Sequence, residues 1–282
     1  MKKMSSMDFN KSMLPHNRKE LFFDIIKNHY RDLMVIGLIL LAFSIPLLVV
    51  SFFSDYQIFI LGTKDLEEAT YNQYVISYSF YMNLFKALAL SILGVGVGAV
   101  IKVIKNLCYL EPVFLGYDLK SGLKNNWLSM SVLFFIIGLF NAATMLLIQN
   151  LLLIEELWAS AVIGVTLTVV FMILYPPLML MISHISIYTN KFHKRLFSSF
   201  FMYVRYFLPT LGIFILAGLP FLLFLIPGPY FIFKYMAFVI LCIFLIPICY
   251  VIVFLYSSHV FDKCINQYHF PELVDKGINR IK

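Results

Sequence analysis

Six long apolar runs divide the chain, and each is long enough to cross a lipid bilayer as one helix. They cover residues 33–53, 82–104, 128–149, 157–183, 207–226 and 232–257. A transmembrane helix needs roughly 20 apolar residues. The 282 residues are 61% hydrophobic and only 13% charged, whereas a soluble domain is about half apolar and about a quarter charged. We therefore expect an all-α, polytopic membrane helix bundle with six transmembrane helices.

Lysine and arginine are unevenly distributed between the connections of this predicted bundle. Nineteen of the 22 lie in the N-terminal segment, in the connections after the second and fourth runs, and in the tail. The opposite connections hold only Lys64 and Lys234, and Lys86 lies inside a run. Cytoplasmic connections carry the excess of basic residues. We expect a multi-pass protein of the cytoplasmic (inner) cell membrane with both termini in the cytoplasm, and an exposed outer loop at 54–81.

A basic amphipathic stretch precedes the first, third and fifth runs. The three units share this order over residues 18–48, 117–147 and 193–223. In the second unit, Leu119, Leu123 and Trp127 fall on one helical face. Lys120 and Lys124 form an adjacent stripe, so that such a helix lies at headgroup level with its lysines on anionic lipid phosphates. We predict three helical hairpins, each preceded by a cytoplasmic interfacial amphipathic helix.

These predictions divide one membrane domain, 1–282, into successive segments. The segments are the N-terminal 1–32, the hairpins 33–104, 117–183 and 193–257, and the cytoplasmic tail 258–282. The interfacial stretches either anchor the spans that follow them or form a docking surface for a membrane or cytoplasmic protein partner. The residues of that docking surface would be Lys27, Arg31, Lys120, Lys124, Trp127, Lys194, Arg195 and Arg205.

Lys86 is the one charged residue placed well within a predicted span. A charge inside a span is costly, and by default it suggests a functional site. Lys86 also lies near the outer end of its run, where a long side chain reaches the headgroups without any further role. Its candidate polar partners at that level are Asn141, Gln149, Asn150, Glu155 and Glu156. In the same run, Gly94 and Gly98 have the small-xxx-small spacing that lets helices approach closely.

Enzymatic, metal and nucleic-acid functions find no support in the motifs. The chain has no GxSxG, HExxH, phosphate-binding loop or paired CxxC. The histidines His184, His193, His259 and His269 on the basic side have no metal-ligand spacing. We predict no catalytic residues, no metal and no cofactor. The net charge of +7 does not indicate nucleic acid, because the basic residues fall in short blocks between apolar runs. The predicted partner for those blocks is the bilayer with its anionic headgroups.

Two short segments resemble a known family. KSGLKNNW before the third run (120–127) and FSIPLL in the first run (43–48) resemble bacterial YesL-type multi-span integral membrane proteins of unknown function. Genes of that family often neighbour carbohydrate ABC-importer genes. The resemblance therefore implies an accessory role in solute uptake, and it supplies no binding or catalytic residues for this chain.

Two functions of different classes remain from the sequence. The first is a non-enzymatic membrane protein that serves as an accessory or partner subunit in carbohydrate uptake. The second is a small-solute permease or channel with a path between the repeats. A permease needs polar residues at mid-bilayer, and the spans hold few beyond Asn141, Thr144, Thr166 and Thr168. The scarcity of such residues favours the accessory role.

Overall fold

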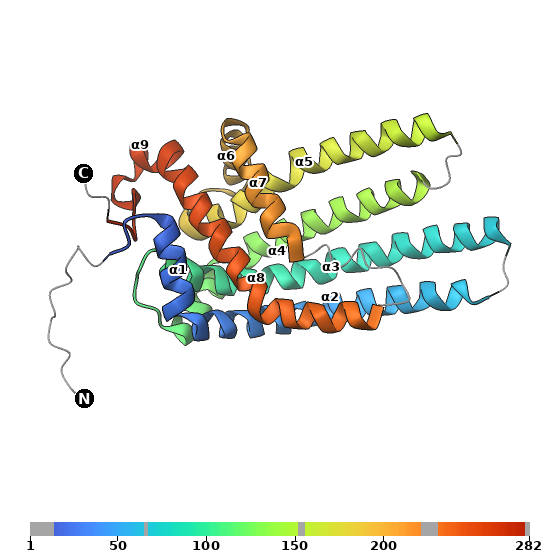
Figure 1. The fold of residues 1–282 in the computed structure, drawn as a ribbon, viewed down its shortest axis with the longest axis horizontal. Coiled ribbons are helices and arrows are strands. Elements are labelled where there is room, and N and C mark those ends of the chain that lie inside the picture. Colours follow the sequence, from blue (N-terminus) through green and yellow to red (C-terminus); the bar gives the residue numbers. More distant parts are fainter. Residues whose placement is uncertain (1–13, 65–66, 152–155, 221–230, 280–282) are drawn as a thin grey trace.

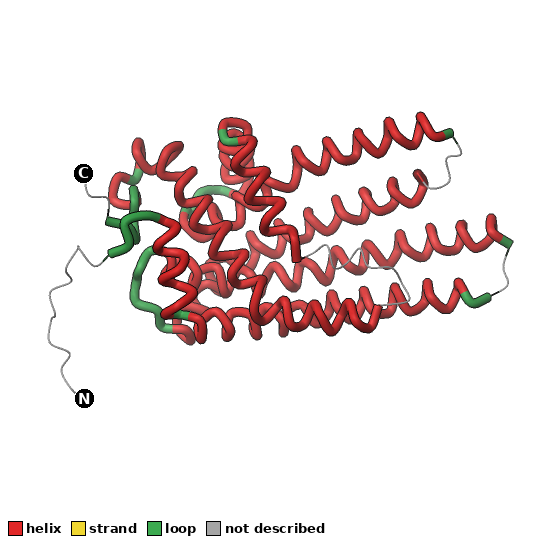
Figure 2. Tube along the Cα trace, in the orientation of Figure 1, coloured by secondary structure: helices red, strands yellow, loops and turns green. Residues whose placement is uncertain are grey.

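The structure is a computed structural model that describes residues 14–64, 67–151, 156–220 and 231–279. Within these ranges the chain is almost entirely helical and contains no strand (Figures 1 and 2). The long helices are α2 (Tyr30–Gly62), α3 (Glu68–Cys108), α4 (Leu115–Leu151), α5 (Leu157–Ile187) and α8 (Phe231–Phe261). The shorter elements are α1 (Arg18–Asn28), α6 (Phe192–Arg205), α7 (Phe207–Gly218), the π-helical turn η4 (Asp262–Asn266), α9 (Gln267–His269) and η5 (Pro271–Leu273).

Five of these helices, α2, α3, α4, α5 and α8, are long and apolar enough to cross a membrane. Helices α6 and α7 meet at a bend of 107° and count as a sixth candidate only as a pair. The 12 residues of α7 span only about 18 Å at about 1.5 Å per residue. Residues 221–226 of the predicted fifth span lie outside the described part of the chain. The prediction of an all-α bundle of long apolar helices, as in a multi-pass membrane protein, is confirmed. Of the six predicted spans, five are single helices of sufficient length among the described residues, and the fifth span in sequence depends on the bent α6–α7 pair.

The prediction of an exposed outer loop at 54–81 is wrong. Helix α2 continues to Gly62, and α3 already begins at Glu68, so most of this segment is helical. The prediction failed because it ended each helix where hydropathy falls. A helix ends at residues that stop it, and the only glycine or proline between 54 and 81 is Gly62. Polar residues are good helix formers once they lie beyond the hydrocarbon.

The three predicted amphipathic helices differ from one another in the structure. Helices α1 and α6 are separate elements ahead of α2 and α7. The stretch at 117–127 is not separate, because it forms the first turns of one unbroken helix, α4. A sharp turn there has no residue to support it, since the one glycine, Gly122, packs its backbone against the carbonyl of Ala99 on α3. Lys120 and Lys124 are exposed on these first turns of α4.

The start of α1 is fixed by its own side chains. Asn17 caps the helix by accepting the backbone N–H of Glu20 at 2.8 Å. The Glu20 carboxylate reaches back and accepts the backbone N–H of His16 at 2.8 Å. Leu21 and Ile25, one turn apart, are completely buried. Helix α1 therefore packs its apolar face on the bundle and turns its basic face outward.

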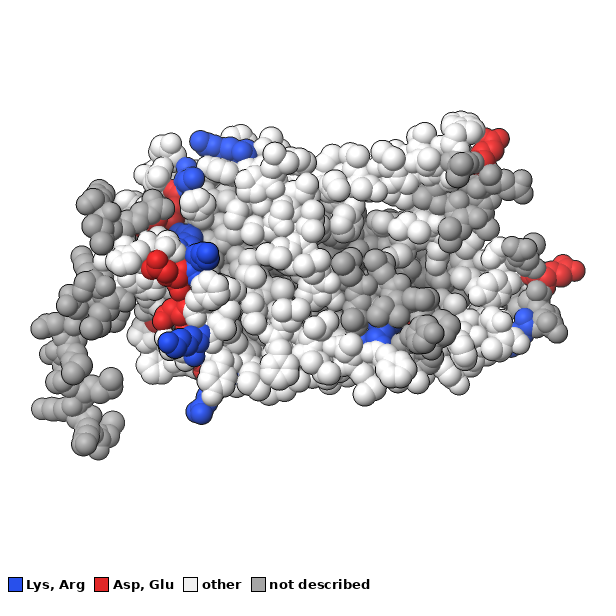
Figure 3. All heavy atoms as spheres, viewed as in Figure 1, with Lys and Arg blue, Asp and Glu red and all other residues white. Residues whose placement is uncertain are grey.

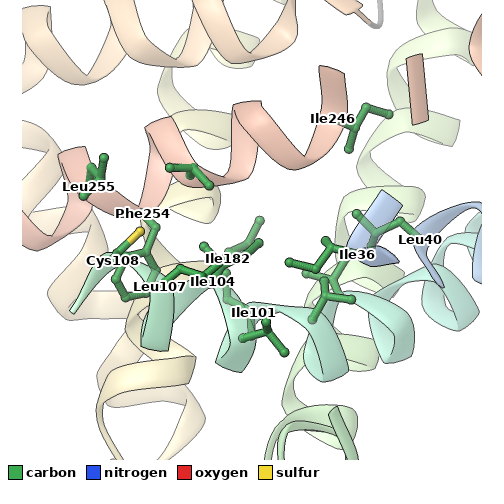
Figure 4. Close-up of a cluster of buried hydrophobic side chains, with 14 of the residues drawn as sticks. Ile36, Leu40, Ile101, Ile104, Leu107, Cys108, Ile182, Ile246, Phe254 and Leu255 are labelled. Atoms are coloured by element: carbon green, nitrogen blue, oxygen red, sulfur yellow. The ribbon is translucent and has the colours of Figure 1, made fainter. Parts of the chain in front are cut away.

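Helix α3 lies at the centre of the bundle and packs against α2, α4, α5 and α8. Figure 4 shows the apolar cluster around its second half, where Ile101, Ile104 and Leu107 meet side chains from α2, α5 and α8. Val97, Val100 and Val103 on the same helix are completely buried as well. The most extensive pairing is between α3 and α4. This contact joins the predicted first and second hairpins to each other.

The first and last described segments meet at one end of the bundle. The backbone N–H of Asn279 donates to the carbonyl of Pro15 at 2.8 Å. We call this the basic end, formed by α1, the α3–α4 connection, α6 and η4. Figure 3 shows the visible lysines and arginines concentrated there, followed by a broad uncharged surface along the helices. The last turns of α2 and α4 and the first turns of α3 and α5 lie at the opposite end (Figure 1).

Candidate functional site

A charged cluster joins α2, α3 and α8 toward the opposite end. Lys234, in the first turn of α8, is ion-paired with Asp55 near the end of α2. The hydroxyl of Tyr235 donates to the same carboxylate at 2.9 Å. From α3, the ammonium of Lys86 donates to the hydroxyl of Ser54 at 3.4 Å. We call Asp55, Lys86, Lys234 and Tyr235 the outer charged cluster.

The environment of this cluster is largely apolar. The Lys234 side chain is only 5% exposed, and that of Asp55 is 20% exposed. A charge buried among apolar groups must be paired or must bind a ligand, because water no longer stabilises it. The cluster contains the ammonium groups of Lys86 and Lys234 but only one carboxylate, that of Asp55. It therefore carries one excess positive charge. A small anion would complement that charge.

The sequence identified Lys86 but missed the ion pair beside it. The sequence places Asp55 in the predicted outer loop and Lys234 among the cations of the opposite connections, and each lies within three residues of a predicted span end. Two opposite charges at the same end of two different spans were a signal for pairing. The sequence alone did not show that α2 and α8 are neighbours, and that contact is needed to bring the two charges together.

The predicted polar partners of Lys86 lie elsewhere. Asn141 accepts the hydroxyl of Tyr175 at 2.6 Å, and Asn150 donates to the backbone carbonyl of Leu146 at 2.7 Å. Glu156 is exposed before the first turn of α5. The carboxamide oxygen of Gln149 is buried and has no hydrogen-bond partner within the described ranges, and Glu155 lies outside those ranges. In the structure, Lys86 hydrogen-bonds to Ser54 rather than to this set.

The predicted docking residues share the basic end but belong to four helices. All of them are exposed apart from Arg195, which is half-buried. They lie on α1 and α2 (Lys27, Arg31), α4 (Lys120, Lys124, Trp127) and α6 (Lys194, Arg195, Arg205). Large aromatic side chains are exposed nearby, including Phe114 at 66%, Tyr117 at 71% and Phe197 at 75%. Basic and aromatic residues in one band are typical of a membrane–water interface.

Glycines hold α3 and α4 in close contact over most of their paired length. A Cβ on Gly94 would lie 2.6 Å from the carbonyl oxygen of Met130, and one on Gly138 would lie 2.5 Å from the Cα of Ala87. A Cβ on Gly98 would lie 3.3 Å from the backbone of Asn126. The amide of Asn126 donates to the carbonyl of Gly98 at 3.4 Å. Backbone lies against backbone here, which leaves no room for a solute between these two helices.

Asp262 closes the basic end. Its carboxylate, with a side chain only 6% exposed, is ion-paired with Arg18 from α1. It also accepts the amide of Asn266 at 2.7 Å and the backbone N–H of Asp275 at 3.2 Å. The Asn266 amide oxygen in turn accepts the hydroxyl of Tyr188, and burial raises the pKa of Tyr188 well above its usual range. One side chain thus links the N-terminal helix, the end of α8 and the tail.

The tail itself packs under the α3–α4 connection. Lys276 is ion-paired with Glu111. Gly277 has a φ of +86°, and any Cβ there would meet the carbonyl oxygen of Cys108 at 2.5 Å, so only glycine fits this position. Ile278 is 9% exposed. The tail is therefore an integral part of the closed basic end.

We expect Asp262→Asn to loosen the tail. The substitution removes the charge that pairs with Arg18 and weakens the bond to the Asp275 backbone. Charge-assisted hydrogen bonds contribute about 1.5–3 kcal/mol each, so trypsin cleavage after Lys276 should accelerate roughly tenfold or more through local opening. Quantitative mass spectrometry of that peptide measures the rate. Glu111→Gln, at a pair whose side chains are 34% exposed, is the control and should change the rate far less. Equal rates in wild type and Asp262→Asn would contradict the assigned role.

Within the described ranges, no three histidine, cysteine, aspartate or glutamate side chains lie close enough to hold a metal ion. The described cysteines are all free thiols, and Cys108 and Cys242 are buried. A scan against models of known protein families finds no match. Comparisons with curated proteins and with solved structures find none either.

Proposed function

We propose that this chain is a non-enzymatic integral membrane protein of the bacterial cytoplasmic membrane. It would serve as an accessory subunit in solute uptake, with carbohydrate as the solute class implied by the YesL-type resemblance. Its basic end would face the cytoplasm, in keeping with the excess of lysine and arginine there. A protein partner would dock on the exposed basic and aromatic residues of that end.

The observation that carries this proposal is the rigid presentation of Lys120, Lys124 and Trp127. These residues lie on the first turns of α4, which are held against α3 by Gly122 and Asn126. All three side chains are exposed, Trp127 at 47%. A surface that is already ordered loses little conformational entropy when a partner binds. The close α3–α4 contact also argues against a solute path between those two helices.

Affinity purification after gentle cross-linking tests the proposal. The full chain carries either Lys120→Glu and Lys124→Glu, or, as a matched control, Lys64→Glu at the opposite end. We expect wild type and control to recover an importer ATPase or permease subunit at constant stoichiometry, and the double variant to lose it by about tenfold or more, because like-charge contacts cost several kcal/mol at an interface. Recovery of the chain alone in all three cases would contradict docking.

A small-solute permease is the second candidate, and the outer charged cluster is the observation that favours it. A cluster that carries an excess positive charge, inside the membrane or at its boundary, can bind an anionic solute. Lys86→Ala removes the ammonium that donates to Ser54. In proteoliposomes, a permease would show a change in solute flux with this variant, whereas an accessory subunit would show none.

A further inference from the structure

Two cationic side chains from different elements lie near the ring of Tyr206, at the α6–α7 bend. The guanidinium carbon of Arg205, the last residue of α6, lies 5.9 Å from the centre of the Tyr206 ring. The ammonium of Lys263, in η4, lies 5.9 Å from the same centre. Each charge therefore lies within the distance of about 6 Å at which an aromatic ring attracts a cation. Both cationic side chains are exposed.

Among the described residues, no carboxylate forms an ion pair with either of these two cations. The ion pairs that the structure shows among its described residues involve other cations, and neither Arg205 nor Lys263 belongs to one. Elsewhere at the basic end, Arg18 and Lys276 each have an acidic partner. Like charges brought together by the fold raise the local positive potential. The site at Tyr206 is thus complementary to an anion that the chain does not itself provide.

The surroundings of the two cations select the kind of anion. Phe201 and Val204 on α6 are 69% and 68% exposed, and Leu208 at the start of α7 is 75% exposed. Because α6 and α7 meet at 107°, α6 lies close to the membrane plane when α7 follows the bundle axis. Exposed apolar side chains beside paired cations at that level match a phospholipid, whose phosphate meets the cations and whose acyl chains cover the apolar residues.

We propose that Arg205, Lys263 and Tyr206 form a binding site for the phosphate of an anionic phospholipid. The lipid belongs to the leaflet on the side of the basic end. The site shares Arg205 with the predicted docking residues but includes none of those on α4, and it does not depend on a role in solute uptake. The α6–α7 bend contributes to this site because it brings the cation at the end of α6 and the cation of η4 to the same aromatic ring.

Native mass spectrometry of the full chain in mild detergent tests this site. Phosphatidylglycerol and phosphatidylcholine are titrated separately. We expect wild type to prefer phosphatidylglycerol, and Arg205→Gln with Lys263→Gln to lose affinity by roughly fivefold for each charge removed. The control, Lys19→Gln with Lys191→Gln, removes two exposed cations from the same end and should keep the affinity within about twofold, as expected for screened surface charges. If the double variant does not fold, the single variants Arg205→Gln and Lys263→Gln are titrated instead.

Three results would overturn the proposal. The first is equal binding of the two lipids by wild type. The second is equal loss of phosphatidylglycerol in the site and control variants, which would mean a diffuse attraction to the whole basic end. The third is full displacement of the lipid by millimolar inorganic phosphate or by an acidic peptide, which would assign the cations to a soluble anion or to a protein partner.

Discussion

Replacing Asp55 with asparagine is expected to destabilise the chain more than any other single change at the opposite end. The substitution leaves Lys234, whose side chain is 5% exposed, without its carboxylate in an apolar setting. Breaking a buried ion pair from one side costs about 3–5 kcal/mol. In a helical bundle of this size, we expect the unfolding temperature to fall on the order of 10 °C.

The buried thiols of Cys108 and Cys242 provide the measurement, because a thiol-reactive dye reaches them only when the bundle opens. Glu67→Gln is the matched control, since it removes an exposed acid at the same end and should change the midpoint by a degree or so at most. Asp55→Asn combined with Lys234→Met should recover much of the loss, because no unpaired charge then remains. A double variant as unstable as the single one would show that the pair is not the cause.

Gly94→Leu is expected to have the second largest effect. A Cβ at this position would lie 2.6 Å from the Met130 carbonyl oxygen and 2.8 Å from the Phe134 Cβ. The first of these neighbours is backbone and cannot rotate away, so α3 and α4 must separate. Inserting a side chain into a packed contact lowers the free energy of unfolding by about 3 kcal/mol. Here neighbouring contacts between α3 and α4 are lost as well, because the two helices separate.

Gly164→Leu is the control for that prediction. Gly164 is also helical, but a Cβ there meets nothing within 4 Å, so leucine should be neutral or slightly stabilising through its better helix propensity. The same thiol-reactive assay compares the two variants. Similar midpoints for Gly94→Leu and Gly164→Leu would show that the α3–α4 contact is not limiting for stability.

The apolar runs predicted the helices well because transmembrane helices must satisfy their backbone hydrogen bonds internally. Every described span lies within one of the expected segments or extends it. The helix ends were harder to predict, as 54–81 and 117–127 show. Hydropathy reports where hydrocarbon ends, whereas the helix continues until glycine, proline or a tertiary contact stops it. Gly62 stops α2 near such a point, and no comparable residue interrupts α4 at 128.

The candidate sites depended on contacts that no local pattern encodes. The small-xxx-small spacing drew attention to Gly94 and Gly98, and their partner is α4. The ion pair of Asp55 with Lys234 joins residues 179 positions apart, and Arg18 with Asp262 joins residues 244 apart. Such pairs follow from which helices are neighbours, and a single sequence of restricted apolar composition leaves that open. The charged end was predictable, but its internal pairing was not.

The packing of the tail has a consequence for the order in which the molecule folds. Gly277 lies against Cys108, Asn279 bonds to Pro15, and Ile278 belongs to the apolar core between them. Contacts between residues so far apart in the sequence carry a large loop-closure cost, so they form after the intervening helices have paired. Closure of the basic end is therefore expected to be a late step of folding.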